Sequence, residues 1–340
     1  MGKPLVSRVN LEICLTNKMS RNSTVSPEDL QSGDRSVLAR AITQAESTRP
    51  EDIRQTRELL SRLLSRTGHS VRLAVTGPPG AGKSTFIESF GRLLLSKGKR
   101  VAVLSVDPSS TRTYGSILGD KTRMTELSRS EHAFIRPSPS SGFTGGVSPG
   151  TREAVLLCEA AGYDFVIIET VGVGQSEIAV RDMTDCFLLL LIAGAGDELQ
   201  GLKKGIMEMA DLIVLNKDDG ENKGNVRRAK AELSSALRLL DPHSGPVPTL
   251  MTCSSLENEG METIFESIDS FVAQSKASGI FESRRKEQQL KWLDELLHRH
   301  LIMMLQADGS YPQKRKQAGD DLASGAKNVY EALDFMLTTR

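Results

Sequence analysis

Short apolar runs alternate with amphipathic segments through the middle of the chain. Runs with the length of buried strands lie at 71–76, 101–106, 133–136, 164–168, 186–192, 211–215 and 247–252. Apolar residues recur at helical spacing near 83–97, 151–161, 176–185, 199–210, 223–240 and 260–275. This alternation predicts an α/β fold with a mostly parallel sheet flanked by helices. Ligands of such sheets bind at the carboxyl ends of the strands, so we expect the chemistry there.

The flanking segments follow a different pattern. Residues 35–70 carry two apolar stripes separated at Pro50, which predicts an N-terminal helical extension packed on the α/β domain of 71–275. Residues 276–340 form a C-terminal helical segment. Its stripe predicts either a helix packed on its own domain or a dimerisation arm. The stripe consists of Leu290, Leu293, Leu297, Leu301 and Met304.

Residues 1–34 are rich in Ser, Asn and Thr, and the first 27 of them carry Lys3, Arg8, Lys18 and Arg21 against a single acid, Glu12. This composition predicts a disordered segment, either a mitochondrial transit peptide or an ordinary tail. The expected location is therefore the mitochondrial matrix, with the cytoplasm as the alternative.

Composition narrows the function. Lys plus Arg and Asp plus Glu each number 43, and aromatic residues make up 4%, so a general nucleic-acid binder is not expected. No apolar run reaches the ~18 residues of a membrane helix, so no membrane partner is expected. The four cysteines are far apart and suggest neither a zinc knuckle nor a disulfide framework.

A phosphate-binding motif follows the first predicted strand. The sequence GPPGAGKST fits G-x-x-x-x-G-K-[ST] and opens a predicted helix. Its glycines let successive N–H groups face a phosphate, and the helix N-terminus adds partial positive charge. We expect Lys83 to reach the β- and γ-phosphates and the Ser84 hydroxyl to bind Mg²⁺. The predicted loop consists of Gly77, Pro78, Pro79, Gly80, Ala81, Gly82, Lys83, Ser84 and Thr85.

Two carboxylates end candidate strands, one after the second strand and one after the fourth. Asp107 follows the second strand, where it can serve Mg²⁺ through water or simply form a cap or turn. Glu169 opens Glu169-Thr170-Val171-Gly172 in the place of the D-x-x-G motif of GTPases. Its carboxylate can serve Mg²⁺ or a water, and the Gly172 N–H can meet the γ-phosphate. The predicted metal ligands are Ser84, Asp107 and Glu169.

A nucleotide-base motif follows the sixth strand. Asn216-Lys217-Asp218-Asp219 fits N-K-x-D, and the Asp219 carboxylate can accept hydrogen bonds from guanine N1–H and the 2-amino group. Adenine offers neither pattern, so GTP and GDP are the expected ligands. After the seventh strand, Ser254-Ser255-Leu256 occupies the place where GTPases direct a backbone N–H to the guanine oxygen. The predicted base site consists of Asn216, Lys217, Asp219, Ser254, Ser255 and Leu256.

One catalytic residue of Ras-like enzymes is missing. Their water-orienting Gln directly follows the D-x-x-G glycine, whereas here Val173 follows Gly172 and the next Gln is Gln175. We therefore expect slow intrinsic hydrolysis that a partner or another loop accelerates.

With these motifs, residues from about 71 to 275 resemble the family of GTPases that chaperone methylmalonyl-CoA mutase, which includes the methylmalonic aciduria type A protein and bacterial MeaB. The likeness extends through three longer runs at Gly115–Met124, Glu169–Glu177 and Gly196–Gly201. Tyr114 departs from the glycine usual in the family, which could stiffen the first switch segment.

The resemblance implies a SIMIBI-class GTPase that acts as a homodimer, gates adenosylcobalamin loading onto the mutase and protects that enzyme. Residues matching the family's phosphate and Mg²⁺ site are Lys83, Ser84, Asp107, Asp120 and Glu169. Those matching its additional switch are Asp197, Gln200 and Lys203. Lys203 is in addition a candidate catalytic residue, because it could offset charge that develops on the phosphates.

Two alternatives remain. A nickel-insertion GTPase shares the fold but usually carries His-rich tracts or Cys ligands, whereas this chain has five scattered histidines. A P-loop kinase of a small molecule or transport protein would need an acceptor site, for which we find no motif.

Overall fold

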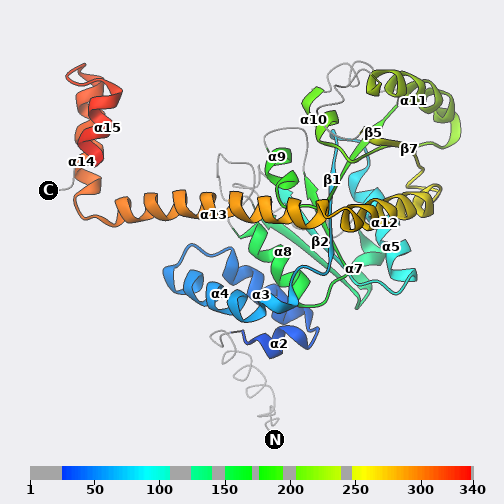
Figure 1. The fold of residues 1–340 in the computed structure, drawn as a ribbon, viewed down its shortest axis with the longest axis horizontal. Helices are drawn as coiled ribbons and strands as arrows, with labels where there is room; N and C mark the ends of the chain where they lie inside the picture. The colour runs from blue at the N-terminus through cyan, green and yellow to red at the C-terminus, as the bar shows by residue number, and fades with distance from the viewer. Residues whose placement is uncertain are drawn as a thin grey trace, which may run out of the picture. The chain divides into compact units, whose positions relative to one another are not determined.

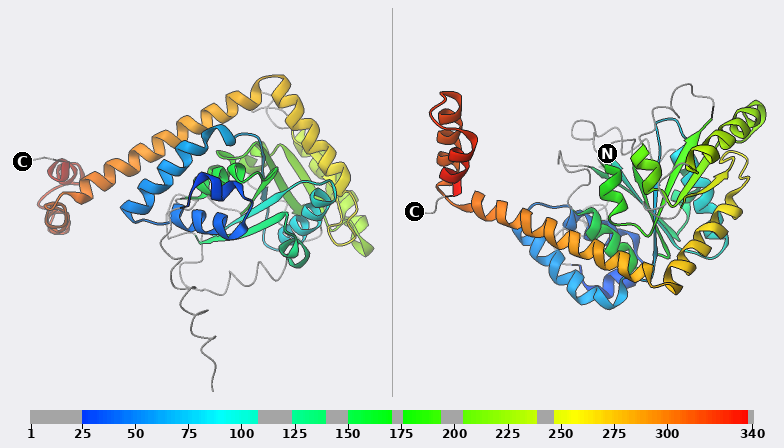
Figure 2. Two further views of the ribbon diagram at one scale, coloured as in Figure 1. Left: turned by 90° about the horizontal axis from the view of Figure 1, so that it is seen from below. Right: turned by 45° about the horizontal axis from the view of Figure 1, so that its top comes forward.

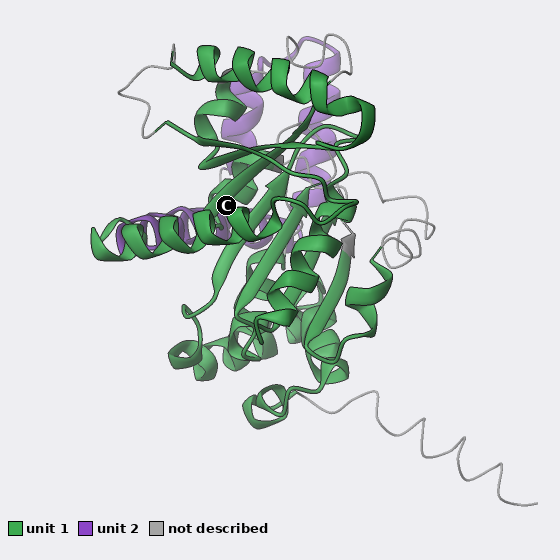
Figure 3. Ribbon diagram, turned by 90° about the vertical axis from the view of Figure 1, so that its right-hand side faces the viewer, with its two compact units in different colours: residues 1–281 green, residues 282–340 purple. Residues whose placement is uncertain are grey.

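The computed structural model describes residues 25–107, 124–139, 150–170, 176–193, 204–238 and 247–337. The chain divides into two compact units, residues 1–281 and residues 282–340 (Figure 3).

A parallel sheet of seven strands forms the centre of the first unit (Figure 1). Its order is β3-β2-β4-β1-β5-β6-β7, so the first strand lies in the middle between β4 and β5. The strands are β1 Val71–Thr76, β2 Val101–Asp107, β3 Ala133–Pro139, β4 Phe165–Thr170, β5 Cys186–Ile192, β6 Leu212–Asn216 and β7 Thr249–Thr252. The predicted α/β fold is thereby confirmed.

Helices cover both faces of the sheet. α5 Lys83–Ser96, α7 Thr125–Arg129 and α12 Met261–Ala277 enclose one core. The other face is covered by α8 Thr151–Ala160, α9 Ser176–Arg181, α10 Lys204–Met209 and α11 Lys223–Leu237. Successive strand residues point to opposite faces, and in β1 Ala74 joins one core while Leu73 and Val75 join the other. Burial on both faces explains the continuous apolar runs of the sequence.

Element ends differ from the predictions at a few places. β3 continues to Pro139, beyond the predicted end at residue 136, because these residues pair in register with β2 up to Asp107. β3 is an edge strand, where proline is tolerated. The short helix α7 escaped prediction; its Leu127 is buried in the core.

The N-terminal extension forms helices as predicted. α3 Arg35–Ala45 and α4 Pro50–Leu63 both contact α8, and Figure 2 shows these blue helices beside the sheet domain. The apolar stripe after Pro50 includes Leu64 in the sequence, but Leu64 is exposed because α4 ends before it. The segment expected to be disordered contains a helix, α2 Pro27–Gln31, with buried Leu30. A reciprocal capping box between Ser26 and Asp29 stabilises this short helix.

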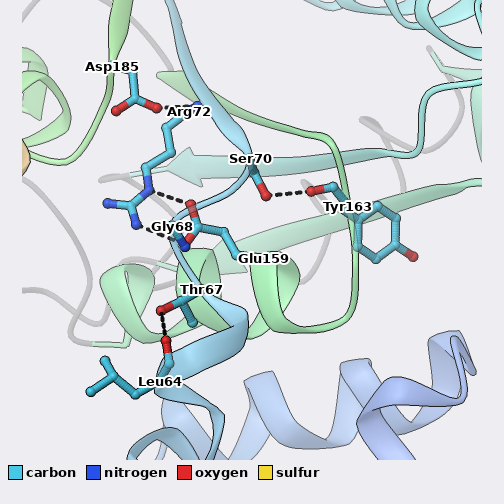
Figure 4. A network of polar contacts seen from close by, with 8 residues as sticks. All are labelled: Leu64, Thr67, Gly68, Ser70, Arg72, Glu159, Tyr163 and Asp185. Atoms are coloured by element: carbon cyan, nitrogen blue, oxygen red, sulfur yellow. Dashed lines mark hydrogen bonds and ion pairs between the residues drawn. The ribbon is translucent and has the colours of Figure 1, made fainter. Parts of the chain in front are cut away.

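A polar network fixes the amino end of β1, on the side away from the phosphate loop (Figure 4). Arg72 donates to both carboxylate oxygens of Glu159 at 2.8 and 2.9 Å, and the Gly68 N–H donates to the same carboxylate at 2.9 Å. The Arg72 N–H donates to Asp185 at 2.8 Å. This network links the segment after α4, the central strand and α8.

The second unit is helical, in line with the prediction for the C-terminal segment. α13 Ile280–Ala307 begins in the first unit and continues through the second, where α14 Tyr311–Ala323 and α15 Val329–Leu337 pack on each other through buried Ala318 and Ala332. The α13 stripe of Leu290, Leu293, Leu297, Leu301 and Met304 is 48 to 60% exposed. Among the described residues, no helix is long and apolar enough to cross a membrane.

Candidate nucleotide site

The glycine loop after β1 has backbone conformations that favour glycine at three positions. Gly77, Gly80 and Gly82 have φ of 147°, 84° and 86°, in the left-handed region. A Cβ on Gly77 would lie 2.0 Å from the carbonyl oxygen of Leu190, so the loop passes directly against β5. Gly82 precedes α5 and has no side chain to cap it. The first N–H groups of this helix can therefore bind an anion.

Lys83 folds back over the loop. Its Nζ donates to the carbonyl oxygens of Gly77 at 2.7 Å and Pro78 at 3.1 Å. Burial lowers the pKa of the Lys83 ammonium below its ordinary value, while the negative charges of Glu169 and Glu177 act in the opposite direction. The Lys83 ammonium thus lies over the predicted phosphate loop. A bound phosphate could replace the two carbonyl oxygens as its hydrogen-bond acceptor.

Glu169 and Ser84 meet beside the loop. The Ser84 hydroxyl donates to Glu169 Oε1 at 3.1 Å, and the Ser105 hydroxyl of β2 donates to Oε2 at 3.2 Å. Hydroxyl and carboxylate oxygens are ligands that Mg²⁺ prefers, so this pair fits the predicted cation. Asp107 ends β2 at the same edge of the sheet, but its side chain is outside the described residues.

Asn216, at the end of β6, connects the base motif to the phosphate loop. Its side-chain amide donates to the Ala81 carbonyl at 2.8 Å. Its Oδ1 accepts hydrogen bonds from the Ser255 N–H at 3.1 Å and the Ser255 hydroxyl at 2.8 Å. The backbone N–H of Ser255, in the segment expected to contact guanine, is therefore engaged within the protein, and Ser255 supports the site through Asn216.

Asp219 is held by the neighbouring loop. The Ser254 hydroxyl donates to Asp219 Oδ2 at 2.5 Å and accepts from the Glu257 N–H at 3.1 Å. Lys217 has a φ of 62°, and its carbonyl accepts a hydrogen bond from Asn222 at 2.9 Å. Leu256 is exposed on the same loop as Ser254.

The structure thus brings together the phosphate loop with Ser84 and Glu169, and the two loops of the base motif. Thr85 lies in the first turn of α5, directly after Ser84. The remaining predicted positions, Asp120, Gly172, Asp197, Gln200 and Lys203, lie outside the described residues. Sequence reasoning missed Ser105, although its place two residues before Asp107 on the same strand is a usable signal.

A glycine loop between the first strand and first helix of a parallel sheet, with N-K-x-D at the end of β6, defines the P-loop nucleotide-binding class. Within that class, residues 38–310 match the family model described as methylmalonyl Co-A mutase-associated GTPase MeaB, and the chain belongs to this family.

Characterised and solved proteins agree with this assignment. The chain is 50% identical to "GTPase ArgK" of Escherichia coli K12 over 91% of this chain and 95% of that protein. It is 44% identical to the mouse "Methylmalonic aciduria type A homolog, mitochondrial" over 91% of this chain and 77% of that protein. A crystal structure of a LAO/AO transport system kinase superimposes with a TM-score of 0.70 at 39% identity, covering 98% of both chains.

Proposed function

We propose that this protein binds and hydrolyses GTP, and that its nucleotide state gates adenosylcobalamin loading onto methylmalonyl-CoA mutase and protects that enzyme. The observation that carries the nucleotide part is the anchored Asp219 carboxylate, held at 2.5 Å by Ser254 next to Asn216. Such a carboxylate can accept two hydrogen bonds from guanine, whereas adenine would leave it unpaired at a cost.

Phosphate binding falls to the loop and the start of α5. Lys83 would exchange its carbonyl partners for phosphate oxygens, and backbone N–H groups of the loop would receive the rest. Ser84, Glu169 and Asp107 would hold Mg²⁺. The bound ion would neutralise part of the phosphate charge. Asp120, Gly172 and Lys203 are proposed to complete the site on the strength of the sequence.

The mutase partnership is supported by the family description, which names methylmalonyl Co-A mutase, and the mouse relative's name refers to methylmalonic aciduria. Mitochondrial relatives are named in mouse and worm, and GTPase relatives in bacteria. We propose a mitochondrial location for this chain from the eukaryotic relatives and from the basic, hydroxyl-rich composition of residues 1–27.

Homodimer formation is supported by the exposed stripe on α13. The five side chains of this stripe, Leu290, Leu293, Leu297, Leu301 and Met304, lie 48 to 60% exposed along one helix. A contiguous exposed apolar surface of this kind marks an interaction site. We propose that a second copy of the chain covers this stripe.

The decisive experiment mixes the full chain with the methylmalonyl-CoA mutase of the same organism. Co-purification is measured with GDP, with GTP and with a non-hydrolysable GTP analogue, and cofactor loading is followed by the adenosylcobalamin absorbance of the mutase. We expect a complex whose loading rate depends on the bound nucleotide. Lys83→Ala should remove this dependence. Equal loading in all nucleotide states, or no association, would contradict the proposal.

A kinase is the second candidate, because the solved relative is described as a transport system kinase. Labelled γ-phosphate separates the two functions. Release of all label as inorganic phosphate favours the GTPase, and transfer of label to a protein or small-molecule acceptor favours the kinase.

A further inference from the structure

Ser105 is the second anchor of the Glu169 carboxylate. β2 and β4 are parallel neighbours whose register pairs Ser105 with Glu169, so the two side chains leave the sheet on the same face. Ser105 donates to Oε2 at 3.2 Å while Ser84 of α5 donates to Oε1 at 3.1 Å. Hydroxyls from a strand and a helix thus hold both carboxylate oxygens.

The backbone of Glu169 has little freedom of its own. It pairs with Val75 of β1 on one side and Ser105 of β2 on the other. On the opposite sheet face, the Thr170 hydroxyl donates to the Thr76 hydroxyl at 2.8 Å and fixes the next residue. What remains adjustable is the Glu169 side chain, whose three torsions can rotate the carboxylate. Ser105 therefore contacts the Glu169 carboxylate, whose position the backbone pairing of the sheet does not fix.

We propose that Ser105 is a positioning residue for the Mg²⁺ site. It orients Glu169 so that Oε1 and the Ser84 hydroxyl oxygen face the cation together. A hydroxyl has one proton and two lone pairs, so Ser84 can donate to Glu169 while its oxygen faces a cation. Ser105 contacts only the rear oxygen and does not itself bind the metal. This inference rests on the proposed function, since it assumes Mg²⁺-dependent nucleotide binding.

Burial makes the anchor consequential. Ser105 and Glu169 are both buried, and a buried carboxylate is costly unless its oxygens are hydrogen-bonded. Without the Ser105 hydroxyl, the Glu169 side chain can rotate toward another hydrogen-bond donor. That rotation would move Oε1 away from Ser84. The expected result is a site that still binds nucleotide but binds the cation more weakly.

The test measures the cation directly, in the full chain. GDP affinity is determined by calorimetry in Mg²⁺ and in EDTA, and Mn²⁺ binding to the GDP complex is followed by electron paramagnetic resonance. For Ser105→Ala we expect the Mg²⁺-to-EDTA affinity ratio to fall roughly tenfold, the scale of a hydrogen bond to a charged group. Affinity in EDTA should stay within about twofold, since no phosphate contact is lost. Ser70→Ala is the matched control, because Ser70 is a buried serine at the other end of the sheet.

A further pair of variants guards against failure to fold. Ser105→Thr and Ser105→Val introduce side chains of nearly the same shape, but only threonine keeps the hydroxyl. Only the valine variant should therefore show the lowered Mg²⁺-to-EDTA affinity ratio. In a double-mutant cycle with Glu169→Gln, Ser105→Ala should have no additional effect on the affinity ratio.

The outcomes separate the inference from the proposed function. Suppose that Glu169→Gln lowers the Mg²⁺-to-EDTA affinity ratio. Equal ratios for Ser105→Thr and Ser105→Val, or additive effects in the cycle, would then overturn the role of Ser105 alone. If Glu169→Gln also leaves the ratio unchanged, the Mg²⁺ role of Glu169 in the proposed function fails as well.

Discussion

The side-chain amide of Asn216 donates a 2.8 Å hydrogen bond to the carbonyl oxygen of Ala81, and so fastens the end of β6 to the phosphate loop. A Cβ on Gly82 would lie 2.7 Å from the same amide nitrogen, which shows how closely the two segments approach. The phosphate and base parts of the site therefore share one buried side chain, and the position of each depends on the other.

The first prediction concerns this link. Asn216→Ala leaves the Ala81 carbonyl and the Ser255 N–H and hydroxyl without their partner, so we expect GDP affinity to fall by about 1–3 kcal/mol. Calorimetry with GDP measures the loss. Asn225→Ala is the matched control, because Asn225 is exposed and contacts only the neighbouring Asn222 among the hydrogen bonds found here. Equal affinities for the two variants would argue against the link.

Guanine selectivity depends on Asp219. Asp219→Asn turns an acceptor into a group that also donates, so GTP affinity should fall by about 1–3 kcal/mol through loss of a charge-assisted pair. Xanthosine nucleotides, which carry an oxygen in place of the 2-amino group, should gain affinity. Competition between labelled GDP and unlabelled xanthosine diphosphate measures both effects. Wild-type protein that binds ATP as tightly as GTP would contradict the assignment.

The ion pair between Arg72 and Glu159, at the amino end of β1, is predicted to contribute to the free energy of unfolding. The side chains of Arg72 and Glu159 are 13% and 0% exposed, so Arg72→Met removes the guanidinium that donates to both oxygens of a buried carboxylate. We expect the free energy of unfolding in urea to fall by about 3–5 kcal/mol. Arg54→Met provides the control, since Arg54 and Glu51 are 69% and 58% exposed and such a solvent-screened pair contributes little to stability. Similar losses in both variants would refute the distinction.

The sequence predicted elements and motifs well because their signals are local. Buried parallel strands require continuous apolar runs, and the glycine loop and N-K-x-D are contiguous residues. The contacts that assemble the site are not local. Asn216 and Ala81 are 135 positions apart, and Ser105 meets Glu169 only because β2 lies beside β4. Strand order is set by packing of the whole domain, so these partners could not be predicted from spacing.

Two local features at the N-terminal side of the chain were not predicted: the capping box that begins α2 and the end of α4. Ser26 and Asp29 have capping-box spacing, yet the hydroxyl-rich character of residues 1–34 favoured a prediction of disorder. Leu64 matched the apolar stripe, but α4 ends at Leu63 and the following turn exposes Leu64 to solvent.

Lys203 provides a prediction that rests on the sequence alone, since it lies outside the described residues. No Gln directly follows Gly172, so the transition-state charge needs another source of stabilisation. If Lys203 supplies it when the mutase is bound, Lys203→Ala should spare GTP binding and basal turnover but remove most of the partner-stimulated rate. Single-turnover hydrolysis with and without the mutase tests this. Full stimulation in the variant would direct attention to Gln175 or to a residue of the partner.

The last prediction concerns the stripe on α13. At 3.6 residues per turn, Leu290, Leu293, Leu297, Leu301 and Met304 share one side of the helix. All five are about half exposed, which is unfavourable in a monomer and expected for a surface that a second copy covers. Leu293→Glu combined with Leu297→Glu places two carboxylates in the centre of the stripe, where dimer formation would bury them at high cost. We therefore expect a monomer in sedimentation equilibrium while the nucleotide affinity of the first unit is unchanged.

Arg299→Glu is the matched control for this variant, because Arg299 lies two positions after Leu297 and projects to the opposite side of the helix. It also introduces a carboxylate, so it tests whether added negative charge alone is sufficient to dissociate the dimer. The control should remain dimeric at the concentration at which the double variant is a monomer. A wild-type chain that sediments as a monomer, or a double variant that stays dimeric, would show that the stripe has another partner. In that case the natural candidate is the mutase, and the same double variant should then fail to co-purify with it.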